Sequence, residues 1–141
     1  MFDFKFDWCS EMAGGIDLID TQHQMLFRIG RDMEQLMISR TWEDSTKNLL
    51  DIVCELREYV SYHFYTEENL MLEYDYPNYA THKAFHDSFK KHIIEIDMHY
   101  LGEHPDKALP QLKDYLQDFV FNHILPEDLE LCRYLKTCGM H

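Results

Sequence analysis

The chain is poor in the residues and patterns that mark membrane spans, disulfide frameworks and disordered linkers. Its 141 residues include only 5 glycines and 4 prolines, with no internal repeat and no low-complexity segment. No apolar run approaches the roughly 20 residues of a spanning helix, and the first residues are too acidic for a secretory signal. The 4 cysteines, at positions 9, 54, 132 and 138, form no Cys-x-x-Cys pair and no dense disulfide pattern. We therefore expect a cytoplasmic protein without a membrane partner.

Basic residues are also scarce, because 13 Lys and Arg face 26 Asp and Glu, which gives a formal net charge of -13. Such a negative field repels nucleic acid and anionic membrane surfaces, so neither is expected as a partner. The hydrophobic share of 45% and the charged share of 28% are ordinary for a folded protein of this length. A single domain over residues 1–141 is expected.

Apolar residues recur at alternating steps of three and four, which is the spacing of helices that pack along a seam. This spacing predicts helices over about 17–39, from a capped turn at 41–44 to about 74, over about 79–101, and from about 109 to 125. Pro105 and Pro110 leave the start of the fourth helix open, and Pro126 ends or kinks it before a short final helix at 127–136. Because the connections are short, we expect an all-α, up-down-up-down four-helix bundle with a short C-terminal helix. An N-terminal arm of about 1–16 precedes the bundle at about 17–125, and a C-terminal segment, 126–141, follows it.

Several polar residues occupy seam positions that this spacing reserves for the core: His23, His63, Glu67, His82, His86 and His123. A buried polar group without a partner costs about 1 to 3 kcal/mol, a large share of the ~5 to 15 kcal/mol stability of a domain. In an up-down bundle their places along the four helices lie at one end, so they form one layer. Asp128, five positions after His123, can return over that layer. The remaining histidines, at 92, 99, 104 and 141, lie off the seams and are expected to face solvent.

Five imidazoles and two carboxylates suit iron, zinc, manganese or cobalt, and their number favours two metal ions. If Glu67 and Asp128 each bridge together with a solvent oxygen, three histidines complete six-coordination at one metal. The other two histidines leave the second metal at five. One position then stays vacant for a small ligand.

Four segments resemble the ligand segments of bacterial hemerythrins, and the resemblance covers about residues 8 to 130. They are Gly15-Ile16-Asp17-Leu18-Ile19-Asp20-Thr21-Gln22-His23, His63-Phe64-x-x-Glu67, His82-x-x-x-His86 and Asn122-His123-Ile124-x-x-x-Asp128. The resemblance implies two iron ions with an oxo or hydroxo bridge, bridged also by Glu67 and Asp128. It further implies that His82, His86 and His123 hold a saturated iron, and that His23 and His63 hold an open one. Reversible binding of O2 at the open iron, for storage, delivery or sensing, is the function implied, and small anions such as azide are further expected ligands.

The same resemblance implies an oxygen pocket formed by Phe64, Phe119 and Val120. The family usually has Trp-Leu where this chain has Phe119-Val120, so the shorter Val120 predicts a wider pocket and a faster conversion to the diferric form. The alternatives are a diiron peroxidase or oxidase, and a sensing module that acts through a partner protein. No Glu lies three residues before any histidine, which argues against a ferritin-like oxidase. We expect a binding protein rather than an enzyme, with peroxidase-like activity left open.

Overall fold

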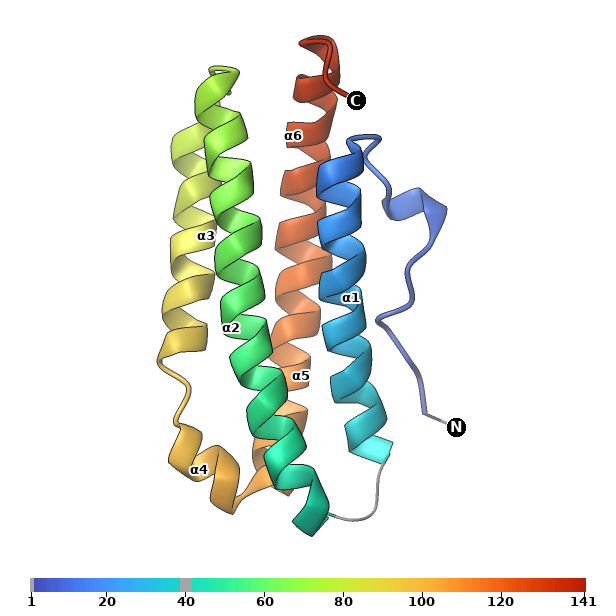
Figure 1. Ribbon diagram of the computed structural model, residues 1–141, viewed down its shortest axis with the longest axis vertical. Helices are drawn as coiled ribbons and strands as arrows, with labels where there is room; N and C mark the ends of the chain where they lie inside the picture. The colour runs from blue at the N-terminus through green and yellow to red at the C-terminus, as the bar shows by residue number, and fades with distance from the viewer. Residues whose placement is uncertain (1, 39–41) are drawn as a thin grey trace.

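The helices of the chain lie side by side in an all-α bundle, as Figure 1 shows for the computed structural model. The structure describes residues 2–38 and 42–141, without the side chains of 42–45. Its long helices are α1 (Asp17–Ile38), α2 (Trp42–Glu73), α3 (Tyr79–Ile94), α5 (Pro105–Phe119) and α6 (Leu125–Thr137), and no strand occurs among the described residues. The expected fold class is confirmed. The predicted capping contact of Thr41 lies outside the described residues.

The third helix is shorter than the sequence predicted, and the prediction of one helix to about residue 101 was wrong. α3 ends at Ile94, and a separate helix, α4 (Met98–Glu103), follows a break. The side chain of Asp97 accepts a hydrogen bond from Tyr100 N at 3.0 Å and so caps α4. The apolar spacing continues across the break because Ile96 and Leu101 still pack against the core. Periodicity alone therefore could not detect it.

The fourth column of the bundle is built from three consecutive pieces. α5 begins with Pro105 in its first turn, where the missing N–H costs no hydrogen bond. A π-helical turn, Val120–Ile124, then joins α5 directly to α6, which carries Pro126 in its own first turn. The predicted final helix is thus present but begins at Leu125, and it continues the fourth column toward the upper end in Figure 1. π-Turns of this kind occur preferentially at functional sites.

The N-terminal arm packs along the bundle beside α1 (Figure 1). Phe6 is only 2% exposed and its ring lies against Gly30 of α1, where a Cβ atom would approach it to 2.4 Å. The buried carboxylate of Glu34 accepts hydrogen bonds from the backbone N–H groups of Lys5 and Phe6 at 2.6 and 3.0 Å. These contacts bind the arm to α1.

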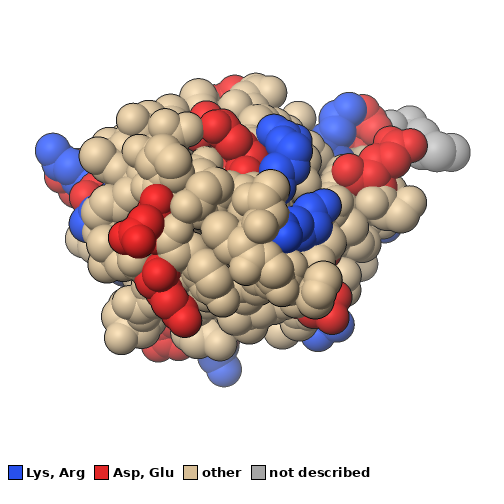
Figure 2. Space-filling model, turned by 90° about the horizontal axis from the view of Figure 1, so that it is seen from above, with Lys and Arg blue, Asp and Glu red and all other residues tan. Residues whose placement is uncertain are grey.

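No described helix is both long and apolar enough to cross a membrane. The end of the bundle at which α1 begins carries acidic and basic side chains scattered among uncharged ones, as Figure 2 shows.

Candidate metal centre

A layer of buried polar side chains separates two apolar clusters of the core. The upper cluster includes Ile19 and Met71, and the lower cluster includes Leu26 and Phe64. On α1, His23 lies between Ile19 and Leu26. On α2, Glu67 lies between Phe64 and Met71, each fully buried. The layer is therefore enclosed by apolar side chains on both sides, where unpaired charges are costly.

The layer contains two overlapping groups of potential metal ligands. One group is His23, His63, Glu67 and Asp128, and the other is Glu67, His82, His86 and Asp128. Within each group one ligand atom per residue lies within 4.8 Å of the others, and all of these residues are buried. Glu67 and Asp128 belong to both groups, so the two carboxylates stand between two sets of histidines.

The helical spacing explains how these side chains meet. His63 and Glu67 lie four residues apart on α2, and His82 and His86 lie four residues apart on α3, so each pair shares one face of its helix. α1 contributes His23 and α6 contributes Asp128. The antiparallel order brings these positions to the same height.

All four histidines of the layer turn their Nε2 atoms toward the carboxylates. Asp128 Oδ2 lies 2.6 Å from His23 Nε2 and 3.1 Å from His63 Nε2, and Asp128 Oδ1 lies 2.8 Å from His82 Nε2. Glu67 Oε1 lies 3.1 Å from His86 Nε2, 3.3 Å from His63 Nε2 and 3.7 Å from His82 Nε2. The nitrogens and oxygens that would bind metal thus converge on one small volume.

Two of the histidines make a hydrogen-bond contact at Nδ1, the ring nitrogen that faces away from the carboxylates. The side chains that provide these contacts were not identified from the sequence. His63 Nδ1 lies 2.7 Å from Gln22 Oε1, and the amide of Gln22 donates to Thr66 Oγ1 at 3.2 Å. His86 Nδ1 lies 3.3 Å from Glu68 Oε2. When a metal binds Nε2, an acceptor at Nδ1 holds the remaining ring proton and orients the ring. Gln22 adjoins a seam position, and a search for amide acceptors beside seam histidines would have found it.

Burial and mutual repulsion give the two carboxylates opposite protonation preferences. Burial, together with the charge of Asp128, raises the pKa of Glu67 well above its ordinary value. Burial also opposes ionisation of Asp128, but hydrogen bonds from His23, His63 and His82 outweigh it and hold its pKa well below the ordinary value.

The surroundings of the histidines shift their pKa values in different directions. Burial lowers the pKa of His63, and it lowers the pKa of His86 to about 3. Burial also disfavours the charged form of His82, yet hydrogen bonds to Asp128 and Glu67 raise its pKa to about 10. The layer therefore carries neutral imidazoles at His63 and His86, which is the form that binds metal.

A buried carboxylate oxygen without a hydrogen-bond partner indicates that the residues of the layer fit a metal centre. Glu67 Oε2 is buried and has no hydrogen-bond partner among the described residues. Such oxygens are expensive in an apolar core unless a cation or a donor satisfies them. Mixed imidazole and carboxylate donors are suited to iron and related divalent ions.

His123, the seventh residue of the predicted ligand set, is not brought into either group. Its side chain is 42% exposed, its Nε2 lies 3.9 Å from Asp118 Oδ2, and its ring lies beside Phe85 and Phe119. It belongs to the π-helical turn between α5 and α6. The four other histidines that the sequence placed off the seams, at 92, 99, 104 and 141, are exposed.

The three predicted pocket residues are buried in the lower apolar cluster. Phe64 and Val120 are fully buried, and Phe119 is 7% exposed. The ring of Phe64 stacks on that of His86 with centroids 3.9 Å apart and an interplanar angle of 8°. Phe119 contacts Phe89 and the ring of His123.

Comparison with known proteins also indicates a cation-binding domain. Residues 14–135 match the family described as hemerythrin HHE cation binding domain. The chain is 33% identical over 125 residues to a bacteriohemerythrin of Clostridium acetobutylicum, an alignment that covers 89% of this chain and 97% of that protein. Bacteriohemerythrins of Stenotrophomonas maltophilia and Campylobacter jejuni are 29% and 33% identical, over 92% and 85% of this chain and 81% and 87% of their own lengths.

Fold and site together define an all-α bundle protein with a buried cluster of histidine and carboxylate ligands for cations. The chain belongs to the hemerythrin family.

Proposed function

We propose that this chain binds two iron ions in the buried layer and binds O2 reversibly at one of them. The observation that carries the proposal is the sharing of Glu67 and Asp128 by the two ligand groups, because shared carboxylates are suited to bridge two ions. In this arrangement His23 and His63 hold one ion, and His82 and His86 hold the other. Membership of the hemerythrin family supports iron as the metal.

The protein side chains supply charge compensation, orientation and exclusion of water. Two ferrous ions supply the electrons that O2 binding withdraws. Glu67 and Asp128 offset much of the cationic charge of the pair, which an apolar core tolerates poorly. Gln22 and Glu68 hold the rings of His63 and His86 in the tautomer that offers Nε2. Phe64 and Val120 contribute an apolar wall that limits access of water and anions.

His123 is proposed as a further ligand of the ion held by His82 and His86. In the structure its ring lies outside the layer, and a change of its side-chain torsions is required to bring it in. The π-helical turn offers a means of aiming it, because the turn rotates the residues beyond Phe119 relative to a regular α-helix. His23 and His63 would hold the other ion with one histidine fewer, and O2 and small anions such as azide would bind there.

The proposed role is that of an oxygen binder of the cytoplasm, for storage, delivery or sensing, and not that of an enzyme. The test is anaerobic loading of the chain with Fe(II), elemental analysis, and optical spectra after O2 is admitted and again after it is removed. Two iron ions per chain and an absorption band that appears with O2 and disappears without it are expected. One metal ion or none after loading, or turnover of peroxide with a reductant without a reversible band, would refute the proposal.

His63→Ala tests the assignment of the layer, with His99→Ala as its matched control, because the side chain of His99 is 82% exposed on α4. The amplitude of the oxygen-dependent band should fall strongly in the first variant and stay unchanged in the second.

A further inference from the structure

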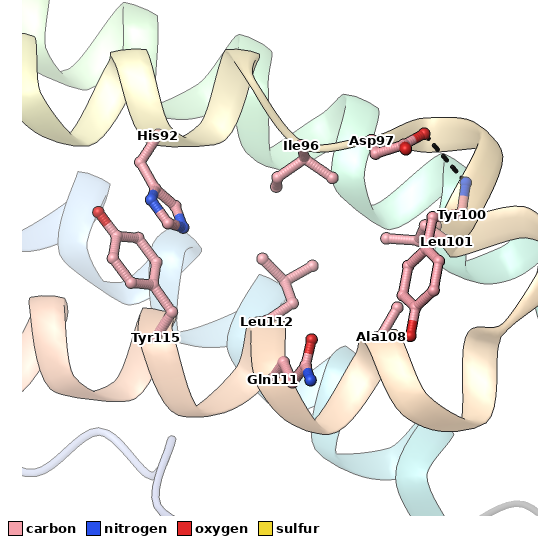
Figure 3. Close-up of a pocket in the computed structure, with 9 residues that line it drawn as sticks. All are labelled: His92, Ile96, Asp97, Tyr100, Leu101, Ala108, Gln111, Leu112 and Tyr115. Atoms are coloured by element: carbon pink, nitrogen blue, oxygen red, sulfur yellow. Dashed lines mark hydrogen bonds between the residues drawn. The ribbon is translucent and has the colours of Figure 1, made fainter.

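A cavity of about 340 Å³ lies between α3, α4 and α5, at the break that separates α3 from α4. Figure 3 shows its lining: the rings of His92 and Tyr115 at one end, Ile96 and Leu112 in the middle, and Asp97 with Tyr100 at the other end. His92, Asp97, Tyr100 and Gln111 are exposed, so the cavity opens to solvent. None of the metal-layer residues lines it, and its volume is that of a small-ligand pocket.

The lining favours a small, planar, uncharged ligand with hydroxyl groups. Apolar and aromatic side chains form most of the wall, so burial of a ligand ring against it is energetically favourable. Among the polar side chains of the lining, the carboxylate of Asp97 is an acceptor without a donor, and the amide oxygen of Gln111 points toward the cavity in Figure 3. Only one oxygen of Asp97 is used by the cap on Tyr100 N, which leaves the other free among the described residues to accept from a ligand. The negative charge of the chain disfavours an anionic ligand.

A column of aromatic rings connects this cavity with the metal layer. Tyr115 lies in the cavity wall and stacks on His92 with centroids 3.6 Å apart. Behind it lies Phe89, parallel to within 5° at 5.8 Å, and Phe89 contacts Phe64 at 5.9 Å. Phe64 in turn stacks on His86 at 3.9 Å. Every step of the column is a contact between neighbouring rings, and the inner members, Phe64 and Phe89, are fully buried.

We propose that the cavity binds a hydroquinone and that the column from Tyr115 through Phe89 and Phe64 to His86 conducts its electrons to the iron centre. The proposed electron transfer rests on the proposed diiron function, whereas the proposed binding of the hydroquinone does not. A ring bound against Leu112 lies beside Tyr115, and its hydroxyl groups donate to Asp97 and Gln111. Electron tunnelling weakens steeply with distance through space, so contiguous rings favour this route over the rest of the apolar core.

The hydroquinone supplies all the electrons and protons of the proposed reaction. A hydroquinone that becomes a quinone loses two electrons and two protons. Two ferric ions take one electron each and become ferrous. One proton passes to Asp97 and on to solvent, and the other passes directly to solvent. The cavity thereby serves to restore the oxygen-binding form after loss of electrons to O2.

Binding is tested first with tetramethylhydroquinone, which carries the two hydroxyl groups of the proposed ligand, under anaerobic reducing conditions in which it transfers no electrons. The purified full-length chain is titrated by calorimetry, whatever its metal content. Ala108→Phe fills the cavity from its wall, and Ala84→Phe places the same side chain on the exposed face of α3 as a control. Saturable binding in the wild type and in Ala84→Phe, with its loss in Ala108→Phe, is expected.

NMR shifts upon titration of the wild type provide a second measurement that needs no variant to fold. They should centre on the methyl groups of Ile96, Ala108 and Leu112. No binding in the wild type, equal binding in Ala108→Phe, or shifts centred elsewhere would overturn the proposed site, even where the chain binds iron and O2 as proposed.

Electron transfer is tested by anaerobic stopped-flow reduction of the diferric protein with tetramethylhydroquinone. Tyr115→Leu should slow reduction by about tenfold, equivalent to ~1.4 kcal/mol in the barrier, whereas Tyr115→Phe keeps the ring and the rate. Tyr65→Leu is the control, because Tyr65 is 68% exposed on α2 and lies outside cavity and column. Reduction by dithionite should go to completion in every variant. An unchanged rate in Tyr115→Leu would show that the column is not the route, and a chain without iron would fail the diiron proposal instead.

Discussion

Glu67 and Asp128 lie in the same buried layer and yet differ in the charge they carry. Three imidazoles donate hydrogen bonds that keep Asp128 ionised, while burial and the charge of Asp128 favour a proton on Glu67. Without a metal the pair therefore holds a proton that a cation would displace. Binding of metal to this layer releases protons, so the metal affinity should fall as pH falls.

His123→Ala tests whether the exposed histidine of the π-helical turn joins the metal layer. If the ring turns inward as proposed, its removal takes one ligand from the ion held by His82 and His86, and the affinity for the second iron should fall by at least about tenfold. Metal titration with a competing chelator measures this affinity. His99→Ala is the control, and equal affinities in the two variants would contradict the role of His123.

Val120→Leu tests whether the valine at this predicted pocket position limits access to the metal centre. Val120 is fully buried, and leucine adds about one methylene, worth roughly 0.8 kcal/mol of apolar burial. If that methylene limits access of water and anions, the oxygenated absorption band should decay more slowly, by about fourfold for a barrier change of this size. The decay is followed at matched pH with and without azide.

Val53→Leu is the matched control for that experiment, because Val53 is also fully buried in the lower cluster but lies far along α2 from His63. A decay in Val120→Leu as fast as in the wild type under both conditions would show that Val120 does not control access.

The residues of the layer could be predicted from the sequence because helical spacing fixes which faces meet. His63 with Glu67, and His82 with His86, fall on seams at equal height, and the structure brings them together. The orientation of His123 could not be predicted in this way. Its position on the seam follows from spacing, but the spacing predicts neither the π-helical turn nor the exposure of its side chain.

At the scale of elements, the N-terminal arm depends on a close approach that only glycine permits. A Cβ atom at Gly30 would lie 2.4 Å from the ring of Phe6. Gly30→Ala should therefore displace the arm and lower the free energy of unfolding by about 1 to 3 kcal/mol, despite the better helix propensity of alanine. Gly102→Ala on α4 meets nothing within 4 Å and should be neutral or stabilising. Urea unfolding of the two variants measures both effects, and equal stabilities would show that the arm is not held by this contact.

The helix boundaries show why elements were predicted less well than residues. Asp97 interrupts the third helix by capping α4, and Pro126 begins α6 instead of ending its column. Each residue has two compatible roles, as a helix breaker and as a first-turn residue, and the surrounding apolar spacing is the same in both cases. The choice between the roles depends on tertiary packing, which a single sequence does not display.

At the scale of the whole molecule, the polar layer lies between two apolar clusters of the described core. The upper cluster is small and includes Ile16, Ile19, Met71 and Leu131, while the lower one contains most of the buried side chains. A metal pair bound as proposed would join residues from α1, α2, α3 and α6 through the layer. Metal should therefore stabilise the bundle as a unit rather than one helix.

Removal of metal should accordingly lower the melting temperature of the whole chain. A ligand that binds only the native state adds about 4 kcal/mol when its free concentration is a thousandfold above its dissociation constant. For a chain of this size that corresponds to a shift of roughly 14 °C. Melting followed by circular dichroism should give a single transition at higher temperature after anaerobic loading with Fe(II). Glu67→Gln should reduce the shift, because it removes a carboxylate that both ligand groups share, whereas His99→Ala should keep it. Coincident melting curves with and without iron would show that the buried layer is satisfied without a metal.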